Sequence, residues 1–244
     1  MHLDKRLQAV ASLVPQGSRF ADIGTDHAYL PVWLLEQGVI ASAVAGDIAA
    51  GPCQAARTTV AMHGAASSIA VRQGSGLAVL RPGEADCIAI CGMGGSTIIS
   101  ILAADMAVAK GAQRLLLQPM AGAAALRRWL VAQGWCITRE ALVDDEPHFY
   151  EIICAERAEK YAVRASDAGE QCYSEVEYFV GPALLRDGHP LLAKHIARQQ
   201  ASLQELLTNM ARSERAKASA KYQEAQKLLQ ALEALKLNLD KSEA

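Results

Sequence analysis

The stretch Arg19-Phe20-Ala21-Asp22-Ile23-Gly24-Thr25-Asp26-His27-Ala28-Tyr29-Leu30-Pro31 decides the fold of this chain. It begins as a buried-strand pattern, ends in an acid and one glycine, and leads through a tight polar turn into a helical pattern. A second strand pattern, Ala43–Ile48, also reaches an acid at its end, Asp47. This arrangement indicates a βαβ unit that holds a ribose-bearing ligand at the carboxyl ends of its strands.

The composition is that of a globular protein, because 51% of the 244 residues are hydrophobic and 20% are charged. The net charge of −2 excludes nucleic-acid binding by the molecule as a whole, so any basic surface must be local. The six cysteines form no CxxC pair and share no metal spacing with the histidines. Without a signal segment or a membrane-spanning run, we expect a reduced, cytoplasmic protein with no metal and no membrane contact.

Three further segments repeat the strand-then-helix rhythm and set the fold class. A helix over residues 3–14 precedes the first strand, and later strands are expected at 69–72, 87–90 and 114–117. Residues 135–143 and 149–155 are both extended around a polar turn, which predicts an antiparallel hairpin. The fold class is therefore α/β, with a Rossmann-like, mostly parallel sheet that carries an antiparallel strand at one edge.

The C-terminal part has a different pattern. Residues near 157–175 are polar and weakly periodic, which indicates a linker, so we expect domains at residues 1–157 and 158–244. A coiled-coil seam follows, spaced 4,3,4,3,4, at Leu192, Ile196, Gln199, Leu203, Leu206 and Met210. Residues 211–215 predict a turn, and a second apolar stripe runs to Leu239. These patterns predict two long antiparallel helices packed as a coiled-coil hairpin.

The first turn favours S-adenosylmethionine over a dinucleotide. A dinucleotide turn would read G-x-G-x-x-G, but here only Gly24 is present. The carboxylate of Asp22 suits the ammonium of a methionine moiety, and Asp47 suits the two ribose hydroxyls. An antiparallel last strand is also typical of methyltransferases that use S-adenosylmethionine. The alternative for Asp22 is a simple turn acid.

The candidate ligand-binding residues lie where the strands end. The expected cofactor-binding residues are Asp22, Gly24, Thr25, Asp47, Ile48, Gly74, Ser75, Gly76, Cys91 and Gly92. The expected acceptor-binding residues in the same domain are Met93, Gly94, Gly95, Gln118, Pro119 and Tyr150. The glycines after the fourth strand would let a ligand approach the backbone, or simply serve a turn with positive φ. No Asn/Asp-Pro-Pro-Tyr/Phe motif is present, which argues against an exocyclic amine acceptor and leaves ring nitrogens open.

Two polar residues of the first turn are candidates for catalysis. A carboxylate that accepts a hydrogen bond from the 6-amino group of adenine would assist attack by N1, and Asp26 is placed for that role. His27 is the alternative. Asp26 could instead be the N-cap of the following helix, and His27 an exposed helix-start residue. We expect Tyr29 to pack and Cys91 to be a small packing residue rather than a reactive thiol.

Together these motifs resemble the bacterial tRNA (adenine-22-N1)-methyltransferase family, the TrmK type. The resemblance rests on Asp22–Pro31, Gly92–Gly95, Gln118-Pro119 and Phe149–Ile152, and it covers residues 1 to about 156. It implies methyl transfer from S-adenosylmethionine to N1 of an adenine in the tRNA D-loop. The chain departs from the family at Ser75, where an acid is common.

The resemblance also implies that the helical hairpin helps to grip tRNA. Residues 186–227 carry eight Lys or Arg against four Asp or Glu. The cations expected to contact phosphates are Arg212, Arg215, Lys217 and Lys221. Two other functions stay open: a methyltransferase acting on another RNA, a protein or a small molecule, and a non-catalytic nucleotide-binding protein that associates through its coiled coil. We expect a monomer.

Overall fold

The structure, a computed structural model, describes residues 1–157 and 173–242 of the chain. The chain divides into two compact units, residues 1–171 and 172–244, which are described separately below. Most of the segment expected to be a linker, residues 158–172, lies outside the described residues.

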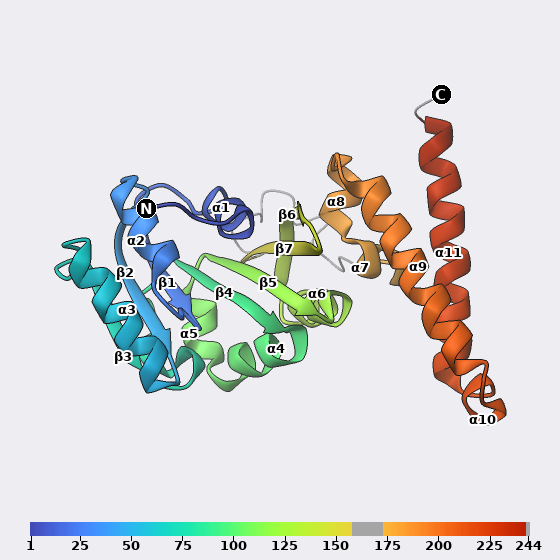
Figure 1. Ribbon diagram of the computed structural model, residues 1–244, viewed down its shortest axis with the longest axis horizontal. Helices are drawn as coiled ribbons and strands as arrows, with labels where there is room; N and C mark the ends of the chain where they lie inside the picture. The colour runs from blue at the N-terminus through green and yellow to red at the C-terminus, as the bar shows by residue number, and fades with distance from the viewer. Residues whose placement is uncertain (158–172, 243–244) are drawn as a thin grey trace. The chain divides into compact units, whose positions relative to one another are not determined.

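The first unit is built on one seven-stranded sheet (Figure 1). Its strands are β1 (Ser18–Ile23), β2 (Ile40–Asp47), β3 (Ile69–Gln73), β4 (Cys87–Gly94), β5 (Arg114–Ala121), β6 (Trp135–Asp145) and β7 (His148–Arg157). The strand order is β3-β2-β1-β4-β5-β7-β6. Strands β1 to β5 are parallel, and β7 lies antiparallel between β5 and β6. The α/β fold class and the hairpin at one edge are therefore confirmed.

Helices cover both faces of this sheet (Figure 1). One face carries α1 (Lys5–Ala11), α2 (Tyr29–Glu36) and α3 (Ala50–Met62). The other face carries the short helix η1 (Gly76–Val79), α4 (Gly95–Ala104), α5 (Met106–Gly111) and α6 (Ala123–Ala132). The strand order reverses between β1 and β4, where the connections leave toward opposite faces. A crevice for ligands forms at such a switch point, outside the carboxyl ends of the strands.

Two strands run further than the sequence pattern predicts. The expected ends were Ile90 and Leu117, but β4 continues to Gly94 and β5 to Ala121. Met93 and Gly94 stay paired with β5 because the register shifts twice between Cys91 and Gly94, and the shifts leave Gly92 outside the pairing. What was predicted to be a free turn is thus an irregular strand end, a bulge of the kind often found beside active sites.

The motif residue Glu151 has a structural partner. Arg127 of α6 is completely buried and donates from Nε to Glu140 Oε1 and from Nη2 to Glu151 Oε2, each at 2.6 Å. A buried charge is stable only when it is paired in this way. The Arg127 network therefore joins α6 to both strands of the hairpin and fixes the strand that carries Tyr150.

The second unit is helical. Its elements are α7 (Glu175–Val180), α8 (Pro182–Asp187), α9 (Leu192–Met210), α10 (Glu214–Lys217) and α11 (Ala220–Ser242). Helices α9 and α11 contact each other as an antiparallel pair (Figure 1). Seam residues Ile196 and Leu203 are buried on α9, as are Ala225 and Leu232 on α11. The helices α7 and α8 were not predicted, and the expected turn at 211–215 partly folds as α10.

Within residues 1–157 and 173–242, none of the helices combines the length and the apolar character that crossing a bilayer requires.

Candidate functional site

Asp22 is a buried carboxylate at the end of β1. It continues the sheet face of Phe20, which packs into the core beneath α1–α3, and it is 7% exposed. Its Oδ2 accepts a 2.7 Å hydrogen bond from Thr25 Oγ1, and no described basic side chain forms an ion pair with it. Burial raises the pKa of Asp22 to about 6, against the opposing effects of the Thr25 hydrogen bond and the Arg6 charge. An acid in this state favours the arrival of a cation.

The turn after Asp22 is fixed by the neighbouring strand. The backbone amides of Gly24 and Thr25 both donate to the carbonyl of Gly46, at 2.8 and 3.1 Å. Gly24 has φ +81°, and a Cβ there would lie 2.2 Å from the Met93 Cε atom. The terminal methyl of Met93 therefore lies against the Gly24 backbone, so the structure brings the β1 turn and the β4 end together.

Asp47 ends β2 beside the turn at residues 74–76, which was expected to bind the cofactor. Its Oδ1 accepts a 2.8 Å hydrogen bond from the Ala49 amide, and its carbonyl accepts one of 2.9 Å from Gly74. The second carboxylate oxygen, Oδ2, has no hydrogen-bond partner among the described residues. Ile48 follows with 68% exposure, an apolar side chain left open at a strand end. A ribose diol and the adjacent face of an adenine fit this pairing of an acceptor with an apolar surface.

The third expected turn, residues 74–76, lies next to Asp47. Gly76 has φ +52°, and a Cβ there would lie 3.0 Å from Ile101 Cγ2 of α4. Ser75 is exposed at the start of η1. The glycine places the chain against α4 and leaves Ser75, the departure from the family pattern, facing solvent at this strand end.

Gln118 holds the irregular end of β4. This side chain is completely buried, and its Oε1 accepts hydrogen bonds from the Gly92 amide and from Arg6 Nη1, both at 3.0 Å. Gly92 has φ +74°, a conformation that favours glycine. Gln118 thus replaces the ladder partner that the bulge removes, while its own Nε2 donates to Pro119 O at 3.2 Å.

The other residues at the end of β4 differ in packing, pairing and chemistry. Gly95 starts α4, and a Cβ there would lie 2.6 Å from the carbonyl oxygen of Gly122, so no larger residue fits. Met93 pairs with Pro119, and Gly94 with Ala121. Desolvation raises the pKa of Cys91 to about 12, so its thiol stays protonated at neutral pH. This supports the packing interpretation of Cys91 over the reactive one.

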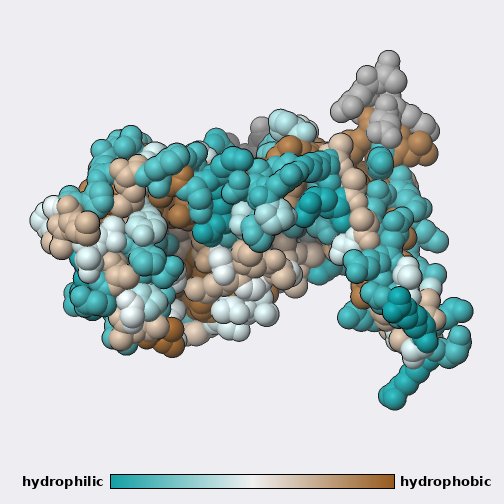
Figure 2. Space-filling view, in the orientation of Figure 1, coloured by the Kyte–Doolittle hydropathy of each residue, from teal (hydrophilic) through white to brown (hydrophobic). Residues whose placement is uncertain are grey.

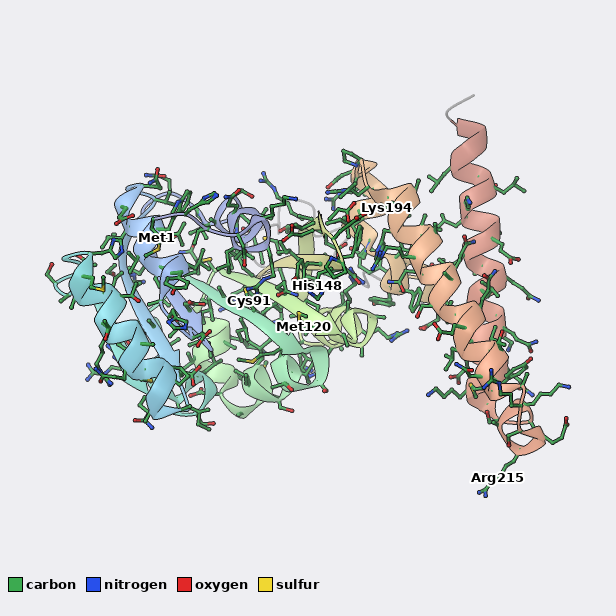
Figure 3. The ribbon with its side chains drawn as sticks, viewed as in Figure 1. Met1, Cys91, Met120, His148, Lys194 and Arg215 are labelled. Atoms are coloured by element: carbon green, nitrogen blue, oxygen red, sulfur yellow. The ribbon has the colours of Figure 1, made fainter. Side chains whose placement is uncertain are left out.

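Arg6 is a site residue that the sequence analysis missed. Besides its bond to Gln118, its guanidinium carbon lies 5.7 Å from the centre of the Tyr150 ring, a cation–π contact. The signal was available: Arg6 stands three residues after Leu3 and four before Val10, on the face of α1 that packs inward. A charged side chain on an inward-facing position needs a polar or aromatic partner, so its presence there indicates a specific contact. Figure 3 labels Cys91, Met120 and His148 near these strand ends.

Tyr150, an expected acceptor-binding residue, contacts two other side chains. It is the third residue of β7, and its ring lies with its centroid 5.8 Å from that of His148, at an angle of 31°. Arg6 contacts the Tyr150 ring as well. Tyr150 therefore helps to position Arg6 at this end of the sheet.

The turn Asp26–Tyr29 corrects two expectations. Asp26 is not the N-cap of α2, because Ala28 occupies that position. Tyr29 does not pack in the core: it is 45% exposed and stacks on His27. Nε2 of His27 lies 3.6 Å from Asp26 Oδ1, and both side chains remain open to solvent. The two candidate catalytic residues thus lie together beside Asp22.

The four predicted phosphate-binding cations belong to the second unit. Arg212, Arg215, Lys217 and Lys221 are all exposed around α10, at the tip of the helical hairpin. Figure 2 shows hydrophilic surface over this tip, and Figure 3 shows Arg215 projecting away from it.

The residues at the strand ends fit S-adenosylmethionine. Asp22 is a buried acid without a cationic partner at the end of β1, and the Gly24 turn that follows it packs against the side chain of Met93. Asp47, at the end of β2, is a second acid with one carboxylate oxygen free to accept a hydrogen bond. Consistent with this, a family model for a methyltransferase domain matches residues 3–153. The protein is thus a methyltransferase by fold and by site.

The comparisons also define the family. The chain is 34% identical over 240 residues to the tRNA (adenine(22)-N(1))-methyltransferase of Bacillus subtilis, with 98% of each chain covered. The crystal structure of the B. subtilis m1A22 tRNA methyltransferase TrmK matches with 32% identity, a TM-score of 0.82, and coverage of 96% of this chain and 99% of that one. A candidate tRNA (m1A22) methyltransferase of Streptococcus pneumoniae, solved with S-adenosyl-L-methionine, matches with 32% identity, a TM-score of 0.81, and coverage of 96% and 100%. This chain belongs to the tRNA (adenine(22)-N1)-methyltransferase family.

Proposed function

We propose that this chain transfers a methyl group from S-adenosylmethionine to N1 of adenine 22 in tRNA. The observation that carries the cofactor part is the buried, unpaired carboxylate of Asp22 at the end of β1. Family membership over nearly the whole chain supports the acceptor. A non-catalytic nucleotide-binding protein would not need a buried acid without an ion-pair partner, such as Asp22, next to the free carboxylate oxygen of Asp47.

The cofactor supplies an electrophilic methyl group when it is bound. Asp22 holds the ammonium of its methionine moiety, with Thr25 Oγ1 keeping the carboxylate in position. Asp47 accepts from the ribose hydroxyls through the oxygen that the Ala49 amide leaves open. Ile48 and the turn at 74–76 border the adenine. Gly24 adopts the left-handed conformation that this turn needs and leaves room for the Met93 methyl, which borders the cofactor site.

The acceptor base enters beside the irregular end of β4. Residues 93–95 form the wall of this entrance, and Gln118 fixes their backbone through the Gly92 amide. Pro119 stiffens the facing end of β5, and Tyr150 holds Arg6 over the site. A base inside a folded tRNA must be extruded to reach this position.

Asp26 assists the attack by N1. An exposed carboxylate accepts a hydrogen bond from the 6-amino group, which increases electron density on N1 as the new bond forms. His27 lies 3.6 Å from Asp26 and keeps that carboxylate oriented. If Asp26 instead serves only the backbone turn, His27 is the remaining acceptor beside the base.

The cations around α10 bind tRNA phosphates. All four are exposed, as side chains that track a phosphate backbone must be. The enzyme acts as a monomer in the cytoplasm, where its substrate is made. The five cysteines of the described residues are all free, which fits a reducing compartment.

One assay tests the whole proposal. Purified protein is incubated with radiolabelled S-adenosylmethionine and unmodified tRNA, and the modified nucleoside is then mapped by digestion and mass spectrometry. We expect one N1-methyladenosine, at position 22, and no label in a tRNA with guanine at that position. Absence of label from every tRNA would overturn the function, and label elsewhere would overturn the site.

A further inference from the structure

The side chain of Tyr29 is exposed where the sequence pattern predicts burial. It is the first residue of α2, and the next residues of that helix, Leu30, Pro31 and Val32, are buried. Tyr29 keeps 45% of its surface open to solvent beside the turn that carries Asp22. A large ring left exposed at the rim of a binding site, in a helix that otherwise faces the core, indicates a contact with something outside the fold.

The ring of Tyr29 is built into a stack. Its centroid lies 5.0 Å from that of His27, and the two planes differ by 7°. His27 in turn lies 3.6 Å from Asp26. Tyr29 has only His27 as a ring partner among the described residues, so one face of the phenol ring is open. Tyr150, by contrast, is already contacted by both Arg6 and His148.

The backbone holds this stack in an unusual conformation. Asp26 and Ala28, which flank His27, have φ values of +35° and +57°, and neither is glycine. The left-handed conformation is unfavourable for such residues and persists where the surroundings enforce it, often at functional sites. Here the completely buried Ala28 donates its amide to the Thr25 carbonyl at 2.8 Å. The same Thr25 binds Asp22, so the ring pair and the cofactor acid share one support.

We propose that the stacked rings of His27 and Tyr29 form the platform on which the extruded adenine rests during methyl transfer. This inference rests on the proposed function and names the surface that holds its substrate base. A purine stacks on an aromatic ring with an energy equivalent to about tenfold or more in affinity, and without need of base-specific hydrogen bonds. Tyr29 is therefore a substrate-binding residue, while Asp26 beside it supplies the polar contact.

Fluorescence of 2-aminopurine, placed at position 22 of an otherwise unmodified tRNA, tests the platform. The base brightens when it leaves the helical stack and is quenched when it stacks on an aromatic ring. With S-adenosylhomocysteine present, the wild type should give a quenched signal, and Tyr29→Phe, which keeps the ring, should quench like it. Tyr29→Ala should give a bright signal and raise KM for tRNA about tenfold, with unchanged cofactor affinity by calorimetry. Met62→Ala, at an apolar position 79% exposed on α3, is the matched control.

Two outcomes separate this inference from the proposed function. If Tyr29→Ala quenches 2-aminopurine as fully as the wild type and keeps its KM, the platform is wrong while the methyltransferase function stands. If the wild-type protein binds the cofactor but neither methylates tRNA nor changes the 2-aminopurine signal, the proposed function fails and the platform fails with it.

Discussion

The two ends of this protein hold charge in opposite ways. In the first unit, one carboxylate, Asp22, is buried at the end of β1 with a single hydroxyl as hydrogen-bond partner. In the second unit, four cations surround α10 in full contact with water. Burying a charge costs desolvation free energy, and the buried charge interacts with a ligand group only at one position. An exposed charge has little desolvation cost, and it interacts with other charges over distances up to the Debye length.

Under the proposed function, this contrast corresponds to two kinds of ligand. A small cofactor needs one strong ion pair at a fixed place, so the protein accepts the cost of desolvating Asp22. A tRNA is large and carries a phosphate at every nucleotide, so several weak and screened contacts suffice. Changes at Asp22 should therefore be large and local, and changes at the hairpin should be additive and sensitive to salt.

Asp22→Asn should produce the largest effect on binding. Removing one partner of a buried ion pair costs about 3–5 kcal/mol, so calorimetry should show S-adenosylmethionine affinity reduced by at least roughly 100-fold. The matched variant is Asp47→Asn at the next strand end, where the side chain is only half-buried. There we expect a loss of about tenfold, as for one or two hydrogen bonds. Equal losses at both positions would refute the special role of burial.

The same Asp22→Asn variant should stabilise the ligand-free protein. The pKa of Asp22 is about 6 in the fold against an ordinary value of 3.8, so the fold disfavours its ionised form. The cost is absent below pH 4, grows as pH rises from 4 to 6, and reaches about 3 kcal/mol above pH 6. Urea unfolding should therefore show the variant more stable at pH 7.5 and equal to the wild type at pH 4. A destabilised variant at pH 7.5 would show that Asp22 is structural.

Charge reversal at the hairpin tip should weaken tRNA binding without touching the cofactor. Replacing Arg212, Arg215, Lys217 and Lys221 by Glu should reduce tRNA affinity roughly tenfold or more in 100 mM salt. The slope of log affinity against log salt should also fall by up to about 3, since each lost phosphate contact removes roughly 0.7–0.9. Filter binding across a salt series measures both quantities. Arg57→Glu, an exposed reversal on α3, is compared with Arg215→Glu alone and controls for the effect of one charge reversal outside the hairpin. An unchanged slope would make the hairpin a structural element.

Much of the fold follows from local patterns. Each of the five parallel strands is a short apolar run ending at an acid, a glycine or a proline, and each was predicted. The acids at the ends of β1 and β2 were predicted as cofactor ligands for the same reason: parallel strands bring their carboxyl ends to one edge. The coiled-coil seam was also predicted from the sequence pattern, and its residues Ile196 and Leu203 lie on the buried side of α9.

The rest depended on long-range contacts. Strand β4 continues through its glycines because Gln118, 26 residues away, satisfies the Gly92 amide. Arg6 reaches the site from the first helix through contacts 112 and 144 residues distant, to Gln118 and Tyr150. Tyr29 was wrongly predicted to pack. Its orientation depends on left-handed conformations at two preceding non-glycine residues, and the sequence does not indicate these conformations. None of these features follows from local periodicity.

Cofactor affinity should depend on pH with a midpoint near 6. The ammonium of the ligand binds the ionised carboxylate of Asp22, so affinity is constant well above the pKa of that group and falls about tenfold per pH unit below it. Calorimetry from pH 5 to 8.5 measures the profile. In Asp22→Asn the profile should be flat over the same range. A wild-type profile without a midpoint near 6 would contradict the assignment of Asp22 as the ammonium ligand.

Arg6→Leu should cause the smallest change, a shift of that midpoint. The positive charge of Arg6 opposes the effect of burial on Asp22, so its removal raises the pKa of Asp22 further and moves the midpoint upward. Cofactor affinity should then be weaker than in the wild type by a few-fold at pH 6.5 and equal at pH 8.5. Lys5→Leu is the control, because Lys5 is 67% exposed and pairs with Asp145. If Arg6→Leu weakens binding equally at both pH values, Arg6 acts by fixing Gln118 and not through the charge of Asp22.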